Sequence, residues 1–290
     1  MDYLIHILVF VGIYTTLAIS LDLVAGHTGL LSLSHAAFFG LGAYTDALFA
    51  THAGMPFLEG IAAGAALAVL MSFVISLPSL RLRDNYFVIA TFGFQMIFFS
   101  ILNNWMSLTR GPLGIGGIPL PVILGWKVES HLEFLILATL LACFAFFVVH
   151  RITSAPFGRV LHAIREDEGF AQALGKNTLR FKVTAFAVSA AIAAMAGSLY
   201  GRYITYIDPT SFTVMESILI ISMVIIGGSS SSWGPLIGAI ALVMLPEALR
   251  FVGLPNGVAA NLRQVFYGAL LVIMIMFRPR GLVGRYGFGR

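Results

Sequence analysis

The stretch SILIISMVIIGGSSSSWGPLIGAIALVMLP runs from Ser217 to Pro246 without a single Asp, Glu, Lys or Arg. A helix that crosses the hydrocarbon layer of a membrane needs roughly 20 mostly apolar residues. This stretch is too long for one straight helix, and glycines and serines interrupt it from Gly227 to Gly234. We therefore predict two short membrane helices joined by a tight turn, which we place on the cytoplasmic side.

Long charge-free stretches recur along the whole chain of 290 residues. Only 10% of the residues are charged and 59% are hydrophobic, whereas about 25% of an average soluble domain is charged. This composition excludes a soluble protein and predicts an all-α, polytopic membrane protein that forms one transmembrane domain over residues 1–290. The other charge-free stretches are Tyr3–Ser20, Gly60–Leu80, Tyr86–Thr109, Phe134–His150 and Val183–Gly201.

The hydropathy pattern predicts about nine transmembrane helices, within a range of eight to ten. The N-terminus runs directly into the first helix, without the basic segment that begins a signal peptide. The single cysteine, Cys143, lies inside an apolar run and is interpreted as a packing residue. The spans are expected near residues 4–21, 30–52, 57–79, 86–102, 131–150, 183–201, 213–228, 235–250 and 260–277.

The basic residues indicate which side of the membrane each loop faces. With the segment 151–182 inside, twelve of the 17 Lys and Arg residues fall in the cytoplasm, in agreement with the positive-inside rule. The N-terminus then lies outside and the C-terminus inside. The cytoplasmic residues are Arg81, Arg83, Arg151, Arg159, Arg165, Lys176, Arg180, Lys182, Arg278, Arg280, Arg285 and Arg290, and the outer ones are Arg110, Lys127, Arg202, Arg250 and Arg263.

Glycines and polar residues interrupt the second predicted span. The segment GHTGLLSLSHAAFFGLGAY, residues 26–44, combines glycines with two histidines and two serines, which predicts a broken or re-entrant helix. Irregular backbone at membrane depth is tolerated only where protein or a water-filled cavity surrounds it. This segment and the interruption at 227–234 are therefore candidates for a transport path.

Small residues four apart predict close contacts between helices, because they let two backbones approach. Such series are Gly60 with Gly64, Ala193 with Gly197 and Gly201, and Gly234 with Gly238.

The longest predicted cytoplasmic loop, residues 151–182, is expected to contain one amphipathic helix of about five turns. Ser154 is the expected N-cap, Pro156 lies in the first turn and Gly175 follows the last turn. The acidic run 166–168 lies at its centre, and anionic lipid would repel it, whereas interfacial helices are usually rich in Lys and Arg. Docking to a cytoplasmic protein is therefore favoured. The apolar face comprises Phe157, Val160, Leu161, Ile164, Ala171 and Leu174.

Seven motifs occur in one order along the chain. They are GHTGLLSLSHAAFFGLGAY (26–44), LRDNYFVIATFGFQMIF (82–98), LNNWMSLTRGPLGIGGIP (102–119), FGRVLHAIREDEGFAQALGKN (157–177), YIDPTSF (206–212), IGGSSSSWGPLIGA (226–239) and RPRGLVG (278–284). This ordered set resembles the permease subunits of branched-chain amino acid ABC importers, specifically the LivM-type rather than the LivH-type subunit. The resemblance covers nearly the whole chain.

The resemblance implies a permease subunit of an ATP-driven importer in the bacterial inner membrane, which translocates branched-chain amino acids or related small polar solutes. The implied partners are a homologous LivH-type permease, two ABC ATPase subunits, an extracytoplasmic solute-binding protein and membrane lipid, with no nucleic acid. In this family the cytoplasmic loop carries the coupling helix that contacts the ATPase. Carried over to this chain, the contact comprises Ala163, Ile164, Arg165, Glu166, Asp167, Glu168, Ala171, Leu174 and Gly175.

No ATPase site is expected in this chain, so separate subunits would bind ATP, and no cofactor or metal is expected here. The segment GFAQALGK, residues 169–176, has five residues between its glycines, whereas a phosphate-binding loop has four. The histidines lack the spacing of known metal-binding motifs.

Two groups of polar residues inside the spans have two interpretations. One group is His35 with Ser32 and Ser34, and the other is Thr91 with Gln95. Each group either lines a path for a zwitterion or forms hydrogen bonds between helices, and we favour the hydrogen bonds. An acidic side chain within a span is costly unless it is paired or hydrated. Asp46 is therefore either a feature of the path or a residue near the outer end of its helix.

The main alternative is a secondary transporter, which would hold a coupling-ion site at the membrane midplane. Against it, the acidic residues of the spans all fall near predicted span ends. A membrane-embedded enzyme would need a catalytic cluster, and no recognisable one occurs in the sequence. The substrate stays open among branched-chain amino acids, urea, short amides and aromatic acids. The acidic residues concerned are Asp22, Asp46, Glu59, Glu216 and Glu247.

The predicted sidedness can be tested at Lys176. A Lys176→Cys variant should react with an impermeant thiol reagent only after the inner face of the membrane is exposed, because the positive-inside rule places this loop in the cytoplasm. Labelling in intact spheroplasts would show that the topology is reversed.

Overall fold

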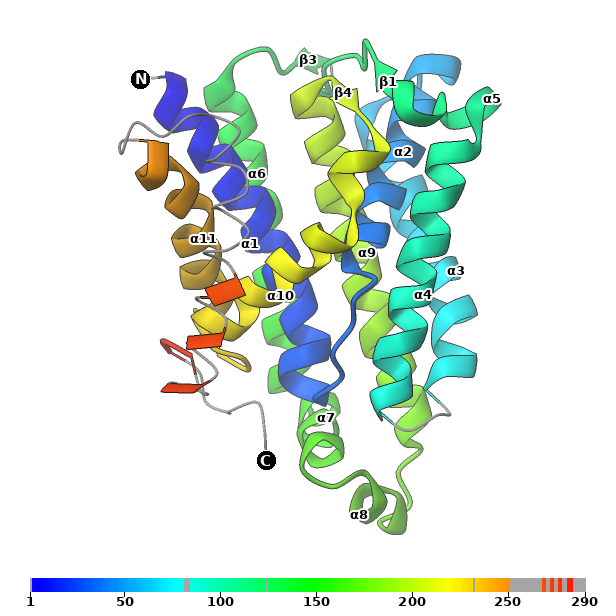
Figure 1. Cartoon of the computed structure of the whole chain (residues 1–290), viewed down its shortest axis with the longest axis vertical. Helices are drawn as coiled ribbons and strands as arrows, with labels where there is room; N and C mark the ends of the chain where they lie inside the picture. The colour runs from blue at the N-terminus through cyan, green and yellow to red at the C-terminus, as the bar shows by residue number, and fades with distance from the viewer. Residues whose placement is uncertain are drawn as a thin grey trace.

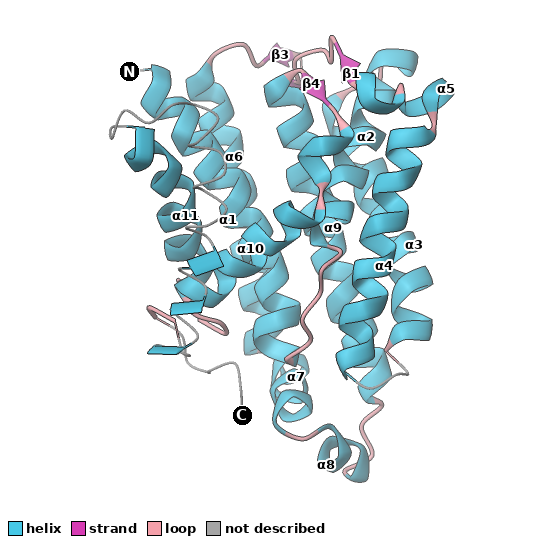
Figure 2. Ribbon diagram, in the orientation of Figure 1, coloured by secondary structure: helices cyan, strands magenta, loops and turns pink. Residues whose placement is uncertain are grey.

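The computed structural model describes residues 2–80, 84–123, 125–231, 233–250, 268–269, 272–273, 276–277 and 281–283. The described chain is a bundle of long helices, with short strands gathered at one end (Figure 1, Figure 2). Helices α7 and α8 lie at the opposite end, which we call the α7–α8 end. The prediction of a mostly helical protein is confirmed.

Eight helices of the described chain correspond to eight of the predicted spans. They are α1 (Asp2–Thr28), α2 (His35–Ala53), α3 (Phe57–Ser79), α4 (Asp84–Asn104), α6 (His131–Ser154), α9 (Thr178–Ile204), α10 (Val214–Gly227) and α11 (Gly234–Arg250). The smaller elements are α5 (Met106–Thr109), η1 (Gly111–Leu113), α7 (Pro156–Glu166), α8 (Glu168–Ala173) and η2 (Pro209–Phe212). Strand β1 (Ile115–Gly116) pairs with β4 (Tyr206–Ile207), and β2 (Val122–Ile123) pairs with β3 (Trp126–Lys127), both antiparallel.

Five of the described helices are long and apolar enough to cross a membrane, namely α1, α3, the Tyr86–Asn104 part of α4, α6 and α9. The predicted pair of short helices in residues 217–246 is confirmed by α10 and α11. The ninth predicted span, near residues 260–277, lies almost entirely outside the described residues. The count of nine spans and the orientation of the termini therefore stay predictions.

The outer surfaces of α3, α4 and α6 are apolar. Large exposed side chains on these helices include Leu70, Phe73, Val74, Ile89, Ile97, Ile136, Leu140 and Phe147. A soluble monomer rarely exposes so extensive an apolar surface, and such a surface suits contact with lipid or with another membrane chain. Cys143, which we interpreted as a packing residue, is exposed on α6 instead.

Helix α9 is the centre of the bundle and packs against α1, α2 and α3. Its contact with α2 is close because both helices present glycine there. A Cβ atom on Gly197 would overlap the carbonyl group of Phe39, and a Cβ atom on Gly42 would overlap the carbonyl group of Ala194. The predicted small-residue contact along α9 is thus confirmed.

Two other predicted small-residue contacts also bring helices together. A Cβ atom on Gly60 of α3 would overlap the carboxylate of Asp46 on α2, and one on Gly64 would lie 3.2 Å from the Cα atom of Gly42. A Cβ atom on Gly238 of α11 would overlap the carbonyl group of Met223 on α10. Backbone approach through glycine therefore joins α3 to α2 and α11 to α10.

A buried ion pair also joins α2 to α9. The Nε and Nη2 atoms of Arg202 donate hydrogen bonds to the two carboxylate oxygens of Asp46 at 2.6 and 3.0 Å. The side chains are only 2% and 1% exposed, and Arg202 Nη1 also donates to the carbonyl group of Pro119 at 3.0 Å. Asp46 is therefore paired inside the bundle and not at an exposed helix end, and Arg202, which we expected in an outer loop, belongs to α9.

The described part of the RPRGLVG motif, residues 281–283, contacts the end of α10. The backbone N–H groups of Leu282 and Val283 donate to the carbonyl groups of Ile226 and Gly227 at 2.9 and 3.0 Å. Gly281 has φ of 72° and comes so close to α10 that an added Cβ would lie 2.6 Å from the carbonyl oxygen of Ile225. Glycine is the residue that combines this φ with so close an approach.

The Asp46–Arg202 pair yields a stability prediction. Arg202→Met should lower the free energy of unfolding by about 3–5 kcal/mol, because the Asp46 carboxylate would stay buried without its partner. The double variant Asp46→Leu/Arg202→Met should be more stable than Arg202→Met, because it buries neither charge. Thermal unfolding in detergent compares both variants with the wild type. A double variant that unfolds below Arg202→Met would contradict this explanation.

Candidate functional site

The chain between α1 and α2 is not helical. Residues 29–34 form an extended segment that begins near the α7–α8 end and runs through the bundle to the start of α2 (Figure 1). Gly29 begins this segment with φ of 78°, a backbone conformation that favours glycine. The predicted break in the second span is confirmed, and the helical part starts at His35 rather than at residue 30.

Side chains alternate along this extended segment, as they do in a strand. Ser32 and Ser34 are buried, whereas Leu33 between them is half-buried. The Oγ atoms of the two serines lie 2.9 Å apart, and the backbone N–H of Leu33 donates to Thr91 Oγ1 of α4 at 3.1 Å. The segment is therefore attached to α4.

Helix α10 also begins inside the bundle, where η2 ends (Figure 1). Ser217 Oγ in its first turn accepts the backbone N–H of Ala36 on α2 at 2.9 Å and donates to Gln95 Oε1 of α4 at 3.4 Å. Gln95 Nε2 donates to the carbonyl group of Phe212 at 2.7 Å. The first turns of α2 and α10 thus meet beside α4. We call the contact of these four residues the central junction.

His35 links the start of α2 to α1 and is 1% exposed. Its Nε2 atom lies 2.7 Å from Ser20 Oγ, and the carbonyl group of Ser20 accepts a hydrogen bond from Ser189 Oγ of α9. The structure thus brings all five predicted path residues into one buried region and shows the hydrogen bonds of our favoured interpretation. Their part in a transport path stays a prediction. The five are Ser32, Ser34, His35, Thr91 and Gln95.

The prediction of a single helix in residues 151–182 is wrong, because two helices, α7 and α8, meet there at a break. Asp167 has an extended backbone, and its carboxylate accepts the N–H of Phe170 at 3.0 Å. Asp167 is therefore the N-cap of α8. Its side chain takes up a backbone N–H group of α8, which favours a new helix start over continuation of α7. Ser154 is not the N-cap of α7 but the last residue of α6, and Ala155 precedes α7.

The predicted apolar face is divided between the two short helices. Leu161 and Ile164 of α7 are buried against the bundle. Ala171 of α8 is buried as well, whereas Leu174 directly after α8 is 63% exposed. Phe170 on α8, which is not part of the predicted face, is 62% exposed. Gly175 follows with φ of 77°, as expected for a glycine after a last helical turn.

The predicted ATPase-contact residues also divide into two groups. The guanidinium group of Arg165 donates to the carbonyl group of Gly26 on α1, and the carboxylate of Glu168 accepts a hydrogen bond from Lys182 Nζ of α9 at 2.6 Å. Together with the buried Ile164 and Ala171, these residues hold the segment to the rest of the chain. Ala163, Glu166, Asp167, Leu174 and Gly175 are exposed.

Sequence analysis missed a polar cluster at the α7–α8 end of α1. Asp22, His27, His162 and Ser230 come together there from α1, α7 and the turn between α10 and α11. Apart from Asp22 and His27, which are both on α1, these residues are far apart along the chain, so no local spacing signals the cluster. Their contacts are described below.

Comparison with known sequences decides the family. Residues 3–275 match the sequence model of the family described as "Branched-chain amino acid transport system / permease component". The chain belongs to this family. The resemblance found from the ordered motifs is thereby confirmed.

Several relatives of this permease align over most of its length. The high-affinity branched-chain amino acid transport system permease protein LivM of Escherichia coli (strain K12) is 33% identical over 294 residues, which cover 93% of this chain and 68% of the relative. The LivM protein of Salmonella typhimurium LT2 is 32% identical with the same coverage. The LivH protein of Salmonella typhimurium LT2 is 27% identical over 94% of this chain and 91% of the relative. No solved structure matches the chain.

Membership of a permease family bears on the non-helical backbone before α2 and before α10. In a membrane permease, non-helical backbone at membrane depth is tolerated only against protein or a water-filled cavity. Three backbone groups at these breaks meet this condition through hydrogen bonds, namely the N–H groups of Leu33 and Ala36 and the carbonyl group of Phe212. The relatives are transport components and not enzymes, which agrees with a chain that acts by moving a solute.

Replacing Gln95 separates the two interpretations of the central junction. Gln95→Leu removes hydrogen bonds to Phe212 and Ser217, so it should lower the free energy of unfolding by about 1–3 kcal/mol and leave the KM of uptake unchanged. Thermal unfolding and uptake kinetics measure the two effects. Asn104→Leu on the exposed end of α4 is the control and should change neither. A raised KM at unchanged stability would assign Gln95 to the path instead.

Proposed function

We propose that this chain is the transmembrane permease subunit of an ATP-driven importer in the bacterial inner membrane. Its solutes are branched-chain amino acids or related small polar molecules. Membership of the permease family carries the proposal, and the relatives named LivM and LivH are permeases of high-affinity branched-chain amino acid transport systems. Separate ATPase subunits hydrolyse ATP, and an extracytoplasmic binding protein delivers the solute.

A homologous LivH-type permease completes the complex with one copy of this chain. The match to both LivM and LivH relatives supports this pairing, since both are named as permeases of a high-affinity branched-chain amino acid transport system. The extended segment 29–34 supports it as well, because its half-buried Leu31 and Leu33 lie on non-helical backbone. Lipid cannot satisfy the hydrogen bonds of such backbone, whereas a partner chain or a water-filled path between two chains can.

The α7–α8 segment is the proposed contact with an ATPase subunit. Helix α7 anchors the segment through its buried Leu161 and Ile164, and α8 then presents Phe170 and Leu174 to the outside. Exposed apolar side chains beside exposed acidic residues give a docking surface with an apolar centre and a charged rim. The bend at Asp167 is what turns these side chains away from the bundle.

We propose that the solute passes beside the central junction. Two helices, α2 and α10, begin there instead of crossing the bundle, and transporters often place their solute sites between discontinuous helices. The hydrogen bonds of Thr91, Gln95 and His35 hold these helix starts in position, and Ser32 and Ser34 lie in the break before α2. Against a secondary transporter, Asp46 is not available to bind a coupling ion, since both of its carboxylate oxygens already accept hydrogen bonds from Arg202.

The docking surface yields a paired test. Phe170→Ala and Leu174→Ala should each weaken co-purification of the ATPase subunits and lower ATP-dependent uptake by about tenfold or more, as expected for central apolar contacts. Membrane insertion and thermal stability should be kept, because both side chains are exposed. Trp126→Ala is the matched control, since Trp126 is 68% exposed at the opposite end of the bundle. Normal uptake and co-purification in both α8-region variants would exclude this surface as the ATPase contact.

A further inference from the structure

A buried polar cluster joins three segments at the α7–α8 end of the bundle. We call it the inner cluster and define it by Asp22 and His27 of α1, His162 and Arg165 of α7, and Ser230 of the turn between α10 and α11. Asp22, His27 and Ser230 are all buried. The family-derived ATPase contact includes Arg165 but none of the other four residues.

The contacts of the inner cluster converge on the last two turns of α1. His27 Nδ1 lies 3.1 Å from His162 Nε2, and His27 Nε2 lies 3.7 Å from Asp22 Oδ2. The backbone N–H of Ser230 donates to Asp22 Oδ1 at 2.9 Å, and Ser230 Oγ donates to the carbonyl group of Gly26 at 3.1 Å. Helix α7 and the α10–α11 turn are therefore attached to the same short part of α1.

Arg165 attaches α7 to α1 a second time. Its guanidinium group donates to the carbonyl group of Gly26, and its side chain lies over Gly29, where an added Cβ would be 3.2 Å from Arg165 Cγ. Gly29 is the first residue of the extended segment that leads to the central junction. Helix α7 thus contacts the place where α1 ends and the extended segment 29–34 begins.

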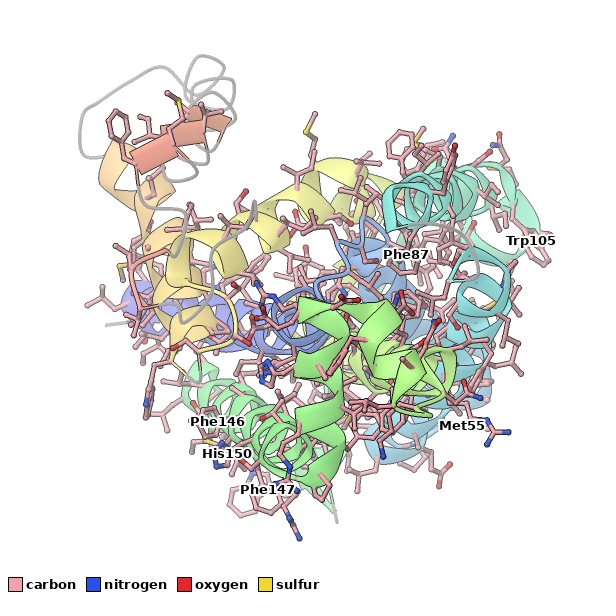
Figure 3. All side chains as sticks on the ribbon, turned by 90° about the horizontal axis from the view of Figure 1, so that it is seen from below. Met55, Phe87, Trp105, Phe146, Phe147 and His150 are labelled. Atoms are coloured by element: carbon pink, nitrogen blue, oxygen red, sulfur yellow. The ribbon has the colours of Figure 1, made fainter. Side chains whose placement is uncertain are left out.

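A cavity of about 430 Å³ lies beside the inner cluster. Residues of α1, α7 and the α10–α11 turn line one part of it, and Phe146, His150 and Thr153 of α6 line another. Seen from below in Figure 3, Phe146 and His150 lie together on α6. Next to the cavity, α6 packs on α1 and α7 through apolar side chains that include Val149, Ile19 and Leu161, so the cavity is confined to the side of this contact where the inner cluster lies.

We propose that the inner cluster is the link that passes movement of α7 to the transport path. This inference rests on the proposed function, in which an ATPase subunit moves the α7–α8 segment. His162 and Arg165 carry the movement to the end of α1, and from there the extended segment carries it to the start of α2. Ser230 carries the same movement to the α10–α11 turn, so that both discontinuous helices shift together. His27, His162, Asp22 and Ser230 are positioning residues in this link.

The first test separates ATP hydrolysis from transport. His162→Ala should leave the assembled complex able to hydrolyse ATP but lower the number of solute molecules imported per ATP by at least about fivefold, a typical size for coupling between two sites. His150→Ala is the matched control, because His150 lines the same cavity but stacks on Phe146. The complex with His150→Ala should import as many solute molecules per ATP as the wild-type complex does. An unchanged ratio in His162→Ala would overturn the proposal.

The second test restores the link covalently. In a Cys143→Ser background, the double variant His27→Cys/His162→Cys should show the same low import per ATP. Joining the two cysteines with a short bifunctional thiol reagent should then raise the ratio toward that of the wild type, and reduction should lower it again. A ratio that stays low after complete cross-linking would overturn the link. Absence of ATP-dependent uptake by the wild-type complex would instead overturn the proposed function.

Discussion

The close contact between α2 and α9 sets the positions of the other helices. Lipid tails are as apolar as leucine side chains, so helices in a membrane associate through packing and polar contacts rather than through the hydrophobic effect. Gly42 and Gly197 remove the side chains that would hold the two backbones apart, and α3 joins the same contact through Gly60 and Gly64. Because α2 starts at the central junction, the contact between α2 and α9 also determines where the first turns of α2 and α10 meet.

The two ends of the bundle are held by different kinds of polar contact. At the strand end, Asp46 and Arg202 form a fully buried ion pair with two hydrogen bonds, and Arg202 also binds the carbonyl group of Pro119. At the other end, single hydrogen bonds of the inner cluster lie beside a large cavity. Separating the ion pair would leave charges buried, and moving Asp22 away from Ser230 would leave a buried carboxyl group without this hydrogen bond. Buried polar groups therefore hold helices together at both ends of the bundle, as an ion pair at one end and as a hydrogen-bonded cluster at the other.

Local sequence patterns predicted much of the fold but only part of the candidate site. Apolar runs located the helices, and glycine series located their contacts, because both effects act over one or two helical turns. The acidic run 166–168 was placed at the centre of one continuous helix, because an Asp N-cap and an exposed helical Asp have the same local composition. The pairing of Asp46 with Arg202 could not be predicted, since 156 residues separate them. The inner cluster likewise depends on how α1, α7 and the α10–α11 turn pack.

The contact between the RPRGLVG motif and α10 has a consequence for biosynthesis. The carbonyl groups of Ile226 and Gly227 accept hydrogen bonds from Leu282 and Val283, which the ribosome adds after α11. Two of the last carbonyl groups of α10, which the helix itself leaves unpaired, thus lack these partners while α10 is being synthesised. These two hydrogen bonds can form only after the chain has been synthesised as far as Val283. The end of α10 is therefore expected to be completed after α11 has been made.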